Sequence, residues 1–327
     1  MLPLTDLTDI EASYRYHAAE MTSSPCYEDW ALGVADDPEV LGLLSTLPTD
    51  KQQANLVFTA ARWHGLAPGP YADLRTLLLG PDWPTVRSTI LSRRTQTNEV
   101  GRLTALVPAI SLLGEQPLAL VELGASAGLC LFPDRFDHVW EGVGSLRGSG
   151  GPVLTTAADG PVPIPAAHPR VVARVGVDLN PLDVTSADDV SWLRALVWPG
   201  QDERLARLSA AIEVARAEPP RILAGDMHER LDEALALAEA SGGVPVVQHS
   251  AAVAYLDAAA RARFDARMRG LVAAGRCHWI SLEGAPVLPE IAATASRPAA
   301  TAHPFCLAVD GRAVGWATGH GDALTWL

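Results

Sequence analysis

The chain has 327 residues, 48% of them hydrophobic, and carries a formal net charge of −13 at pH 7. This length and hydrophobic share suit a globular protein with one large domain and an accessory region. The negative charge argues against a nucleic-acid partner, because binding phosphates requires clustered Lys and Arg. The four cysteines are far apart and form no C-x-x-C pair, so no metal site is expected.

Targeting signals are not evident in the sequence. The N-terminal residues contain no basic segment that leads into an apolar one. The longest weakly polar run, residues 118–132, contains Glu122 and is shorter than the roughly 20 residues needed to span a bilayer. We therefore expect neither a signal peptide nor a membrane partner, and a cytoplasmic location.

Residues 1–92 are expected to form a helical cap region. Thr8 or Asp9 can cap a helix that ends near Met21, and Asp37 followed by proline predicts the start of a second helix. A third helix is predicted over residues 51–64, where the apolar side chains fall on one face. We interpret this region as a cap on a larger domain, residues 93–327.

The stretch 93–102 is unusually polar. Thr97 is a plausible N-cap for a helix predicted over residues 98–113. Two interpretations remain open: a solvated helix start, or a strip that lines a ligand site. In the second interpretation the substrate-binding residues are Arg94, Gln96, Asn98 and Glu99.

Residues 118–136 predict a strand, a tight glycine turn and a helix. The apolar run ends at Glu122, and the turn contains Gly124, Ser126 and Gly128. This order is typical of nucleotide-type sites in α/β sheets. Because burying an unpaired charge is costly, Glu122 is expected at the mouth of the site and hydrogen-bonded.

The remaining chain predicts a mostly parallel sheet. An insertion of about 139–170 is expected to hold a hairpin of residues 153–157 and 162–164. Strands and helices then alternate up to Leu282, and an antiparallel hairpin follows over residues 304–317. We expect the polar strand ends to meet at one edge, where ligands bind. These residues are Glu122, Asp178, Asp226, His249 and Glu283.

The glycine turn fits two chemistries. Residues 124–128 read as G-x-S-x-G, the nucleophile elbow of hydrolases, with Ser126 followed by Asp226 and then His249 or His303. However, such an elbow normally follows several strands, and the region before Ser126 is predicted to be helical. Hydrolysis is therefore the least favoured interpretation.

The second chemistry rests on a resemblance. Residues 122–128 resemble the first motif of class I S-adenosylmethionine (SAM) methyltransferases, Asp178 resembles their ribose-binding acid, and residues 225–227 their adenine-binding turn. More closely, nearly the full chain resembles a bacterial family catalogued only as a domain of unknown function. The stretches that carry this resemblance are residues 93–102, 122–129, 176–183 and 281–284.

The resemblance implies a Rossmann-like methyltransferase sheet with SAM as cofactor. The candidate catalytic residues are His249, as the base, and Glu283 and Tyr255, which would shape the acceptor pocket. The expected reaction is methyl transfer to a small polar metabolite. The alternatives are cyclisation, elimination or alkyl transfer on the same fold, or a non-catalytic subunit that supports a protein partner. The implied cofactor-binding residues are Glu122, Gly124, Ser126, Gly128, Asp178, Leu179, Asn180, Asp226 and Met227.

Overall fold

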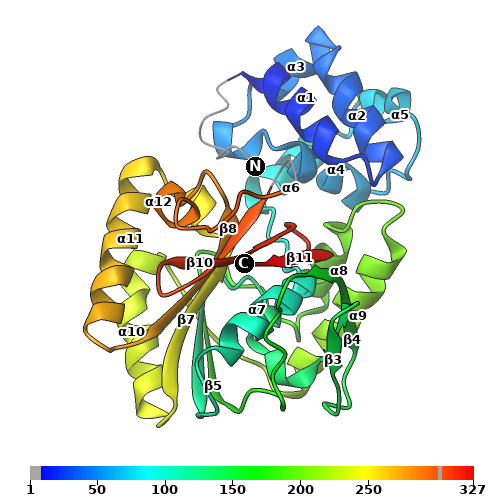
Figure 1. Ribbon diagram of the computed structural model, residues 1–327. Helices are drawn as coiled ribbons and strands as arrows, with labels where there is room; N and C mark the ends of the chain where they lie inside the picture. The colour runs from blue at the N-terminus through cyan, green and yellow to red at the C-terminus, as the bar shows by residue number, and fades with distance from the viewer. Residues whose placement is uncertain (1–8, 301–303) are drawn as a thin grey trace. The chain divides into compact units, whose positions relative to one another are not determined.

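The computed structural model describes residues 9–300 and 304–327 (Figure 1). These residues form two compact units. The sheet unit consists of Asn98–Ser186 and Arg207–Leu327. The helical unit consists of the described residues up to Thr97 together with Ala187–Ala206. Residues Ala187–Ala206 thus belong to the helical unit, although the predicted larger domain, residues 93–327, includes them.

The helical unit begins where the sequence predicts. Asp9 accepts a hydrogen bond from Glu11 N, and Asp37 accepts from the backbone N–H groups of Glu39 and Val40. Thr8 lies outside the described residues. Tyr27, Trp30 and Phe58 pack ring against ring in its interior. The α-helices of this unit are α1 Ile10–Glu20, α2 Pro25–Ala35, α3 Pro38–Leu44, α4 Ala54–Trp63, α5 Tyr71–Leu78, α6 Trp83–Ser92 and α8 Ala187–Ala195.

Arg93, the first residue of the polar stretch, connects the two segments of the helical unit. Its guanidinium carbon lies 5.5 Å from the ring centroid of Trp63 and 5.3 Å from that of Trp192. It also forms ion pairs with Asp188 and Asp189 on α8. Arg93 therefore fastens α8 to the helices that precede it in the chain.

In the described residues, the sheet unit is built on a single sheet of eleven strands. The parallel strands β6, β5, β1, β7 and β8 are neighbours in that order, and β9 and β10 follow as the predicted antiparallel hairpin. The full order is β3-β2-β4-β11-β10-β9-β8-β7-β1-β5-β6. The strands are β1 Leu118–Leu123, β2 Asp137–Glu141, β3 Gly144–Leu146, β4 Val153–Asp159, β5 Val171–Asp178, β6 Arg221–Ala224, β7 Val244–Ser250, β8 His278–Gly284, β9 Phe305–Val309, β10 Arg312–Ala317 and β11 Ala323–Trp326.

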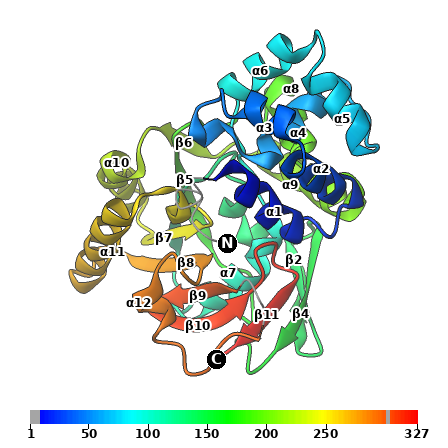
Figure 2. The same cartoon turned by 90° about the horizontal axis from the view of Figure 1, so that it is seen from above.

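Helices α10 (Met227–Ala240) and α11 (Ala258–Ala273) lie side by side against the parallel strands (Figures 1 and 2). Leu123 and Val177 of the sheet pack with Leu235 and Phe264 of these helices in the main core. Helix α7 (Leu103–Ser111) packs on β8 and β9. The other helices are α9 (Asp202–Ala217) and α12 (Pro289–Ala292). None of the helices in the described residues is long and apolar enough to cross a membrane.

The helix predicted after the glycine turn is wrong, and the helix predicted before β1 is present but starts later than expected. The residues after the turn form two short 3-10 helices, Leu129–Leu131 and Pro133–Arg135, instead of an α-helix. The cause is Pro133, because a residue that precedes proline is disfavoured in helical conformation, and Phe132 has φ −117° and ψ 46°. Before β1, the predicted helix start at Thr97 is replaced by Glu99, which caps the 3-10 turn Val100–Arg102 ahead of α7.

The predicted hairpin in the insertion is also wrong. Strand β4 pairs in parallel with β2 and β11, and residues 162–164 form no strand. Prolines at positions 161, 163 and 165 remove every second backbone N–H from this segment, so it cannot supply a regular ladder. The segment that pairs with β4 instead is β11, at the end of the sequence.

Replacing Arg93 tests its place between the two indoles. We expect Arg93→Ala to lower the free energy of unfolding by about 2 kcal/mol, because two cation–π contacts and two ion pairs are lost together. Arg93→Lys should recover only part of this, since an ammonium group cannot stack on both rings. Urea unfolding followed by tryptophan fluorescence measures both. Arg94→Ala is the matched control, because Arg94 is exposed and its distance to Asp50 is 3.8 Å. Equal effects at both positions would contradict this role.

Candidate functional site

The turn after β1 has a backbone that requires small residues. Gly124 and Gly128 have φ values of 73° and 72°, and Ser126 has φ 52°. A Cβ at Gly124 would lie 2.4 Å from the Cβ of Ala252, so the turn and the loop after β7 touch directly. Glycine at position 124 is therefore needed both for its backbone conformation and for this close contact.

The backbone N–H groups of the turn donate inward. Gly124 N and Ala125 N both bond to the carbonyl of Val177, at 2.8 and 3.1 Å. Gly128 N bonds to Ala125 O at 2.6 Å, and Leu129 N to the side-chain oxygen of Asn98 at 2.8 Å. A phosphate-binding loop points such groups at its ligand. This turn is thus not built as a phosphate cradle.

Asp178, at the end of β5, is joined to the turn. Its Oδ2 accepts from Ser126 N at 2.7 Å, and its Oδ1 accepts from Asn180 N at 2.8 Å. These bonds fix the orientation of the carboxylate. Leu179 beside it is an exposed hydrophobic side chain, with 68% of its surface accessible.

Asp226 follows β6, the next strand in the sheet. Its carboxylate accepts from His228 N at 2.7 Å and caps α10, while the neighbouring Met227 is half-buried. The turn before it is tied to β5, because Gly225 N donates to Asp178 O at 2.9 Å. The structure therefore brings the ends of β1, β5 and β6, with their three predicted carboxylates, to one edge of the sheet.

Glu122 is more buried than the sequence suggested. Only 3% of its surface is exposed, and its Oε2 is buried with no hydrogen-bond partner among the described residues, so the expected hydrogen bond is missing at this oxygen. Burial raises the pKa of Glu122 to about 8; the positive charge of Arg102 opposes this shift, and the negative charge of Asp178 adds to it. Glu122 is therefore a neutral acid at pH 7.

Gln248 on β7 is the residue that sequence reasoning did not assign. It is the register partner of Glu122 on the neighbouring strand. Its Nε2 donates to Cys130 O at 2.9 Å, and its Oε1 is buried with no partner in the part of the chain that the structure describes. The sequence does show that an amide side chain follows the apolar run 244–247. That this amide lies next to Glu122 depends on the pairing of β7 with β1.

The four predicted substrate-binding residues are divided between the units. Asn98 and Glu99 lie in the sheet unit, where Glu99 Oε1 accepts from Gly101 N at 3.0 Å and Arg207 Nε at 3.3 Å. Arg94 and Gln96 lie in the helical unit. Asn98 and Glu99 thus support the glycine turn, because they bond to Leu129 and Cys130 directly after it.

Arg102 contacts the end of β7 at the same edge of the sheet. Its Nε donates to Gly319 O at 2.8 Å, and its Nη1 donates to the carbonyl and hydroxyl oxygens of Ser250 at 3.1 and 3.3 Å. Arg102 thereby connects the end of β7 to the loop between β10 and β11.

His249 occupies a buried network on the face that α10 and α11 cover. The indole N–H of Trp279 donates to His249 Nε2 at 2.9 Å, and an indole N–H can only donate. His249 Nδ1 therefore carries the proton, which it donates to Glu283 Oε1 at 2.7 Å. With both nitrogens engaged, His249 has no lone pair left to act as a base, either for Ser126 or for a methyl acceptor. His303 lies outside the described residues.

Glu283 holds the loop that follows β7. Besides His249, its Oε1 accepts from Ala252 N at 2.9 Å and Val253 N at 3.0 Å, while its Oε2 is buried with no partner in residues 9–300 and 304–327. This loop leads into the 3-10 turn that ends at Tyr255, whose side chain is half exposed. Of the three predicted catalytic residues, His249 and Glu283 thus form one network.

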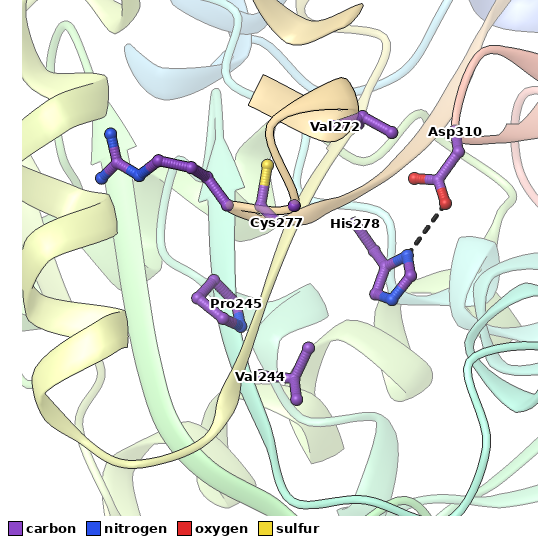
Figure 3. A pocket seen from close by; sticks show the side chains of 8 residues that line it. Val244, Pro245, Val272, Cys277, His278 and Asp310 are labelled. Carbon is purple, nitrogen blue, oxygen red and sulfur yellow. Dashed lines mark hydrogen bonds and ion pairs between the residues drawn. The ribbon is translucent and has the colours of Figure 1, made fainter. Parts of the chain in front are cut away.

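A separate pocket lies at the opposite ends of β7 and β8 (Figure 3). His278 Nδ1 and Asp310 Oδ2 are 2.8 Å apart in its wall, and Asp310 Oδ1 accepts from Trp279 N at 2.7 Å. Val244 and Pro245 form its apolar side. None of the predicted site residues lines it.

The fold and the strand-end cluster define a mixed α/β protein with a candidate small-molecule site at the carboxyl edge of its sheet. The chain belongs to the family described as uncharacterized proteins conserved in bacteria (DUF2332), whose model matches residues 68–326. This confirms the expected membership of a bacterial family of unknown function. No curated protein and no solved structure matches the chain.

The raised pKa of Glu122 predicts how stability depends on pH. From the ordinary pKa of 4.5 up to about 8, the folded protein holds a proton that the unfolded chain has lost, so stability falls as the pH rises through this window. Glu122→Gln, which cannot ionise, should raise the free energy of unfolding by about 5 kcal/mol at pH 8.5 and by less than about 1 kcal/mol at pH 5. Urea titrations at both pH values measure this. The control is Glu229→Gln on the exposed side of α10; a gain that is the same at pH 5 and 8.5 would refute the assignment.

Proposed function

We propose that this protein binds SAM and transfers its methyl group to a small polar metabolite. The observation that carries the proposal is the 2.7 Å bond from Ser126 N to the carboxylate of Asp178. It joins the glycine turn after β1 to the acid at the end of the adjacent strand. A methyltransferase-like site needs these same two elements together, one for the methionine end of SAM and one for its ribose.

The hydrogen-bonding character of the edge supports an adenosine-type cofactor over a phosphate-bearing one. The turn donates its N–H groups inward, and Gln248 Oε1 and Glu283 Oε2 at the strand ends are buried acceptors that have no partner among the described residues. A site short of donors favours a ligand that brings N–H and O–H groups and positive charge. SAM has two ribose hydroxyls, an adenine amine, an ammonium and a sulfonium.

The proposed roles follow from the positions of the strand ends. Asp178 accepts from the ribose hydroxyls, and Asp226 from the adenine amine. Leu179 and Met227 offer apolar surface to the adenine ring. Glu122 holds the methionine end, close to the backbone of Gly124.

Bound SAM supplies an electrophilic methyl group whose transfer leaves a neutral thioether. The contribution of the protein is to align the acceptor with the methyl carbon and sulfur and to exclude water, and such alignment lowers the barrier substantially. His249 and Glu283 act as positioning residues, because their network fixes the loop at residues 251–255. They set the shape of the site without touching the reacting atoms.

One observation favours the alternative of non-methyl chemistry on the same fold. Since both nitrogens of His249 are engaged, the proposed base for an acceptor that must lose a proton is not available. An alkyl transfer or elimination that needs no base at this position remains compatible with the site. A non-catalytic role is less compatible, because the unpaired buried oxygen of Glu122 is costly and a purely structural protein gains nothing from it.

Calorimetry tests the cofactor. We expect the protein to bind SAM, and Asp178→Asn to weaken binding about tenfold or more through loss of the charged acceptor for ribose. Asp183→Asn is the matched control, since Asp183 lies in the same loop and accepts from Thr185. Thermal unfolding of both variants separates lost binding from lost folding. A folded Asp178→Asn variant with unchanged affinity would rule out the ribose assignment.

Product analysis tests the reaction. Incubation with SAM and a bacterial metabolite extract should give a product heavier than its precursor by one methyl group, together with S-adenosylhomocysteine. Mass spectrometry with methyl-labelled SAM identifies the product, and a Gly124→Val variant, in which the turn cannot form, is the control. A product without the labelled methyl would favour the alternative chemistry.

A further inference from the structure

The side chains of Glu122 and Gln248 together make an unusual buried pair. They are register partners on β1 and β7, so both leave the sheet on the same face from strands about 4.8 Å apart. Glu122 is 3% exposed and Gln248 1%. Glu122 Oε2 and Gln248 Oε1 are both buried acceptors, and neither has a donor among the described residues.

The orientation of Gln248 is fixed. Its Nε2 donates to Cys130 O at 2.9 Å, so rotating the amide would break that bond. The oxygen of Gln248 is therefore a pure acceptor, on the same face of the sheet as the carboxyl of Glu122. Two acceptors cannot satisfy each other unless a hydrogen atom lies between them.

The neighbouring charged groups do not supply that hydrogen. Arg102, the nearby cation, donates to Gly319 and Ser250. The thiol of Cys130 donates to Glu99 O, and the carboxylate of Asp178 can only accept. Arg102 favours a charged Glu122, whereas Asp178 and burial disfavour it.

We propose that Glu122 and Gln248 form a clamp for a primary ammonium group, and that a proton occupies this clamp when the ligand is absent. In the free protein the protonated carboxyl of Glu122 donates to Gln248 Oε1, which satisfies both oxygens. On binding, Glu122 releases this proton to solvent, and the ammonium donates one N–H to each oxygen. No covalent bond to carbon changes, and one cation replaces another in the buried site.

The inference rests on the proposed function in one respect: the ammonium it assigns to the clamp is that of the methionine end of SAM. It adds Gln248 as a ligand-binding residue and predicts that the site selects ligands by their amine. The proton also explains how a carboxyl group can stay buried and unpaired until the ligand arrives, because a neutral acid costs far less to bury than a charged one.

The first test uses two ligands that differ only in the amine. S-adenosylhomocysteine and its deaminated analogue, in which hydrogen replaces the amino group, are titrated at pH 7 in two buffers with different ionisation enthalpies. We expect S-adenosylhomocysteine to release about 0.9 proton per site, because an acid with a pKa of about 8 is mostly protonated at pH 7. The analogue should release none and bind at least about tenfold more weakly.

Variants assign the effect to the two residues. Glu122→Gln should abolish proton release, and Gln248→Leu should remove most of the preference for the amine. If the analogue binds as tightly as S-adenosylhomocysteine and neither releases a proton, the clamp is refuted while adenosine binding stands.

A second measurement does not depend on the proposed cofactor. Infrared spectroscopy of the free protein at pH 7 should show a buried carboxylic acid band that Glu122→Gln removes. Methylammonium chloride should reduce this band, whereas tetramethylammonium chloride, which has no N–H donors, should leave it unchanged. If neither nucleoside binds but the band responds in this way, the proposed function fails and the clamp stands; if the wild-type band is missing, the clamp fails.

Discussion

The bond between the carboxylate of Asp178 and the backbone of Ser126 is the constraint on which the candidate site depends. It holds a turn with positive φ values against the end of β5, while Gly124 and Ala125 bond to Val177 on the same strand. Because the turn is fixed on this side, it can touch the loop after β7 on the other, at Ala252. One acidic side chain thereby fixes the turn that lies among three strand ends.

The parts of the fold that sequence could predict are those dictated by local pattern. The alternation of strands and helices up to Leu282 was predicted from the apolar runs, and Asp9 and Asp37 marked helix starts. The errors arose where one local residue overrules the pattern, as Pro133 does after the glycine turn. The pairing of β4 with β11 could not be predicted, because it joins segments more than 150 residues apart.

Some residues of the candidate site could be predicted from local sequence pattern, and others could not. Glu122, Asp178 and Asp226 were predictable because the carboxyl ends of parallel strands must share an edge. Gln248 was not, since its role comes from the register of β7 against β1. His249 was misjudged as a base because a sequence cannot show that Trp279 donates to one nitrogen and Glu283 accepts from the other. Burial and tautomer are properties of the assembled network.

The helical unit is made of two pieces that are far apart in the chain, and this affects the order in which the protein can fold. Arg93 is synthesised about one hundred residues before Trp192 and Asp188, the groups on α8 that it contacts. During translation, helices α1 to α6 therefore cannot form their contacts with α8 until α8 has been synthesised. Strands β1 and β5 precede α8 in the chain and leave the ribosome before it. The N-terminal segment is thus not an independent folding module, and a fragment that stops before α8 would lack part of its own interior.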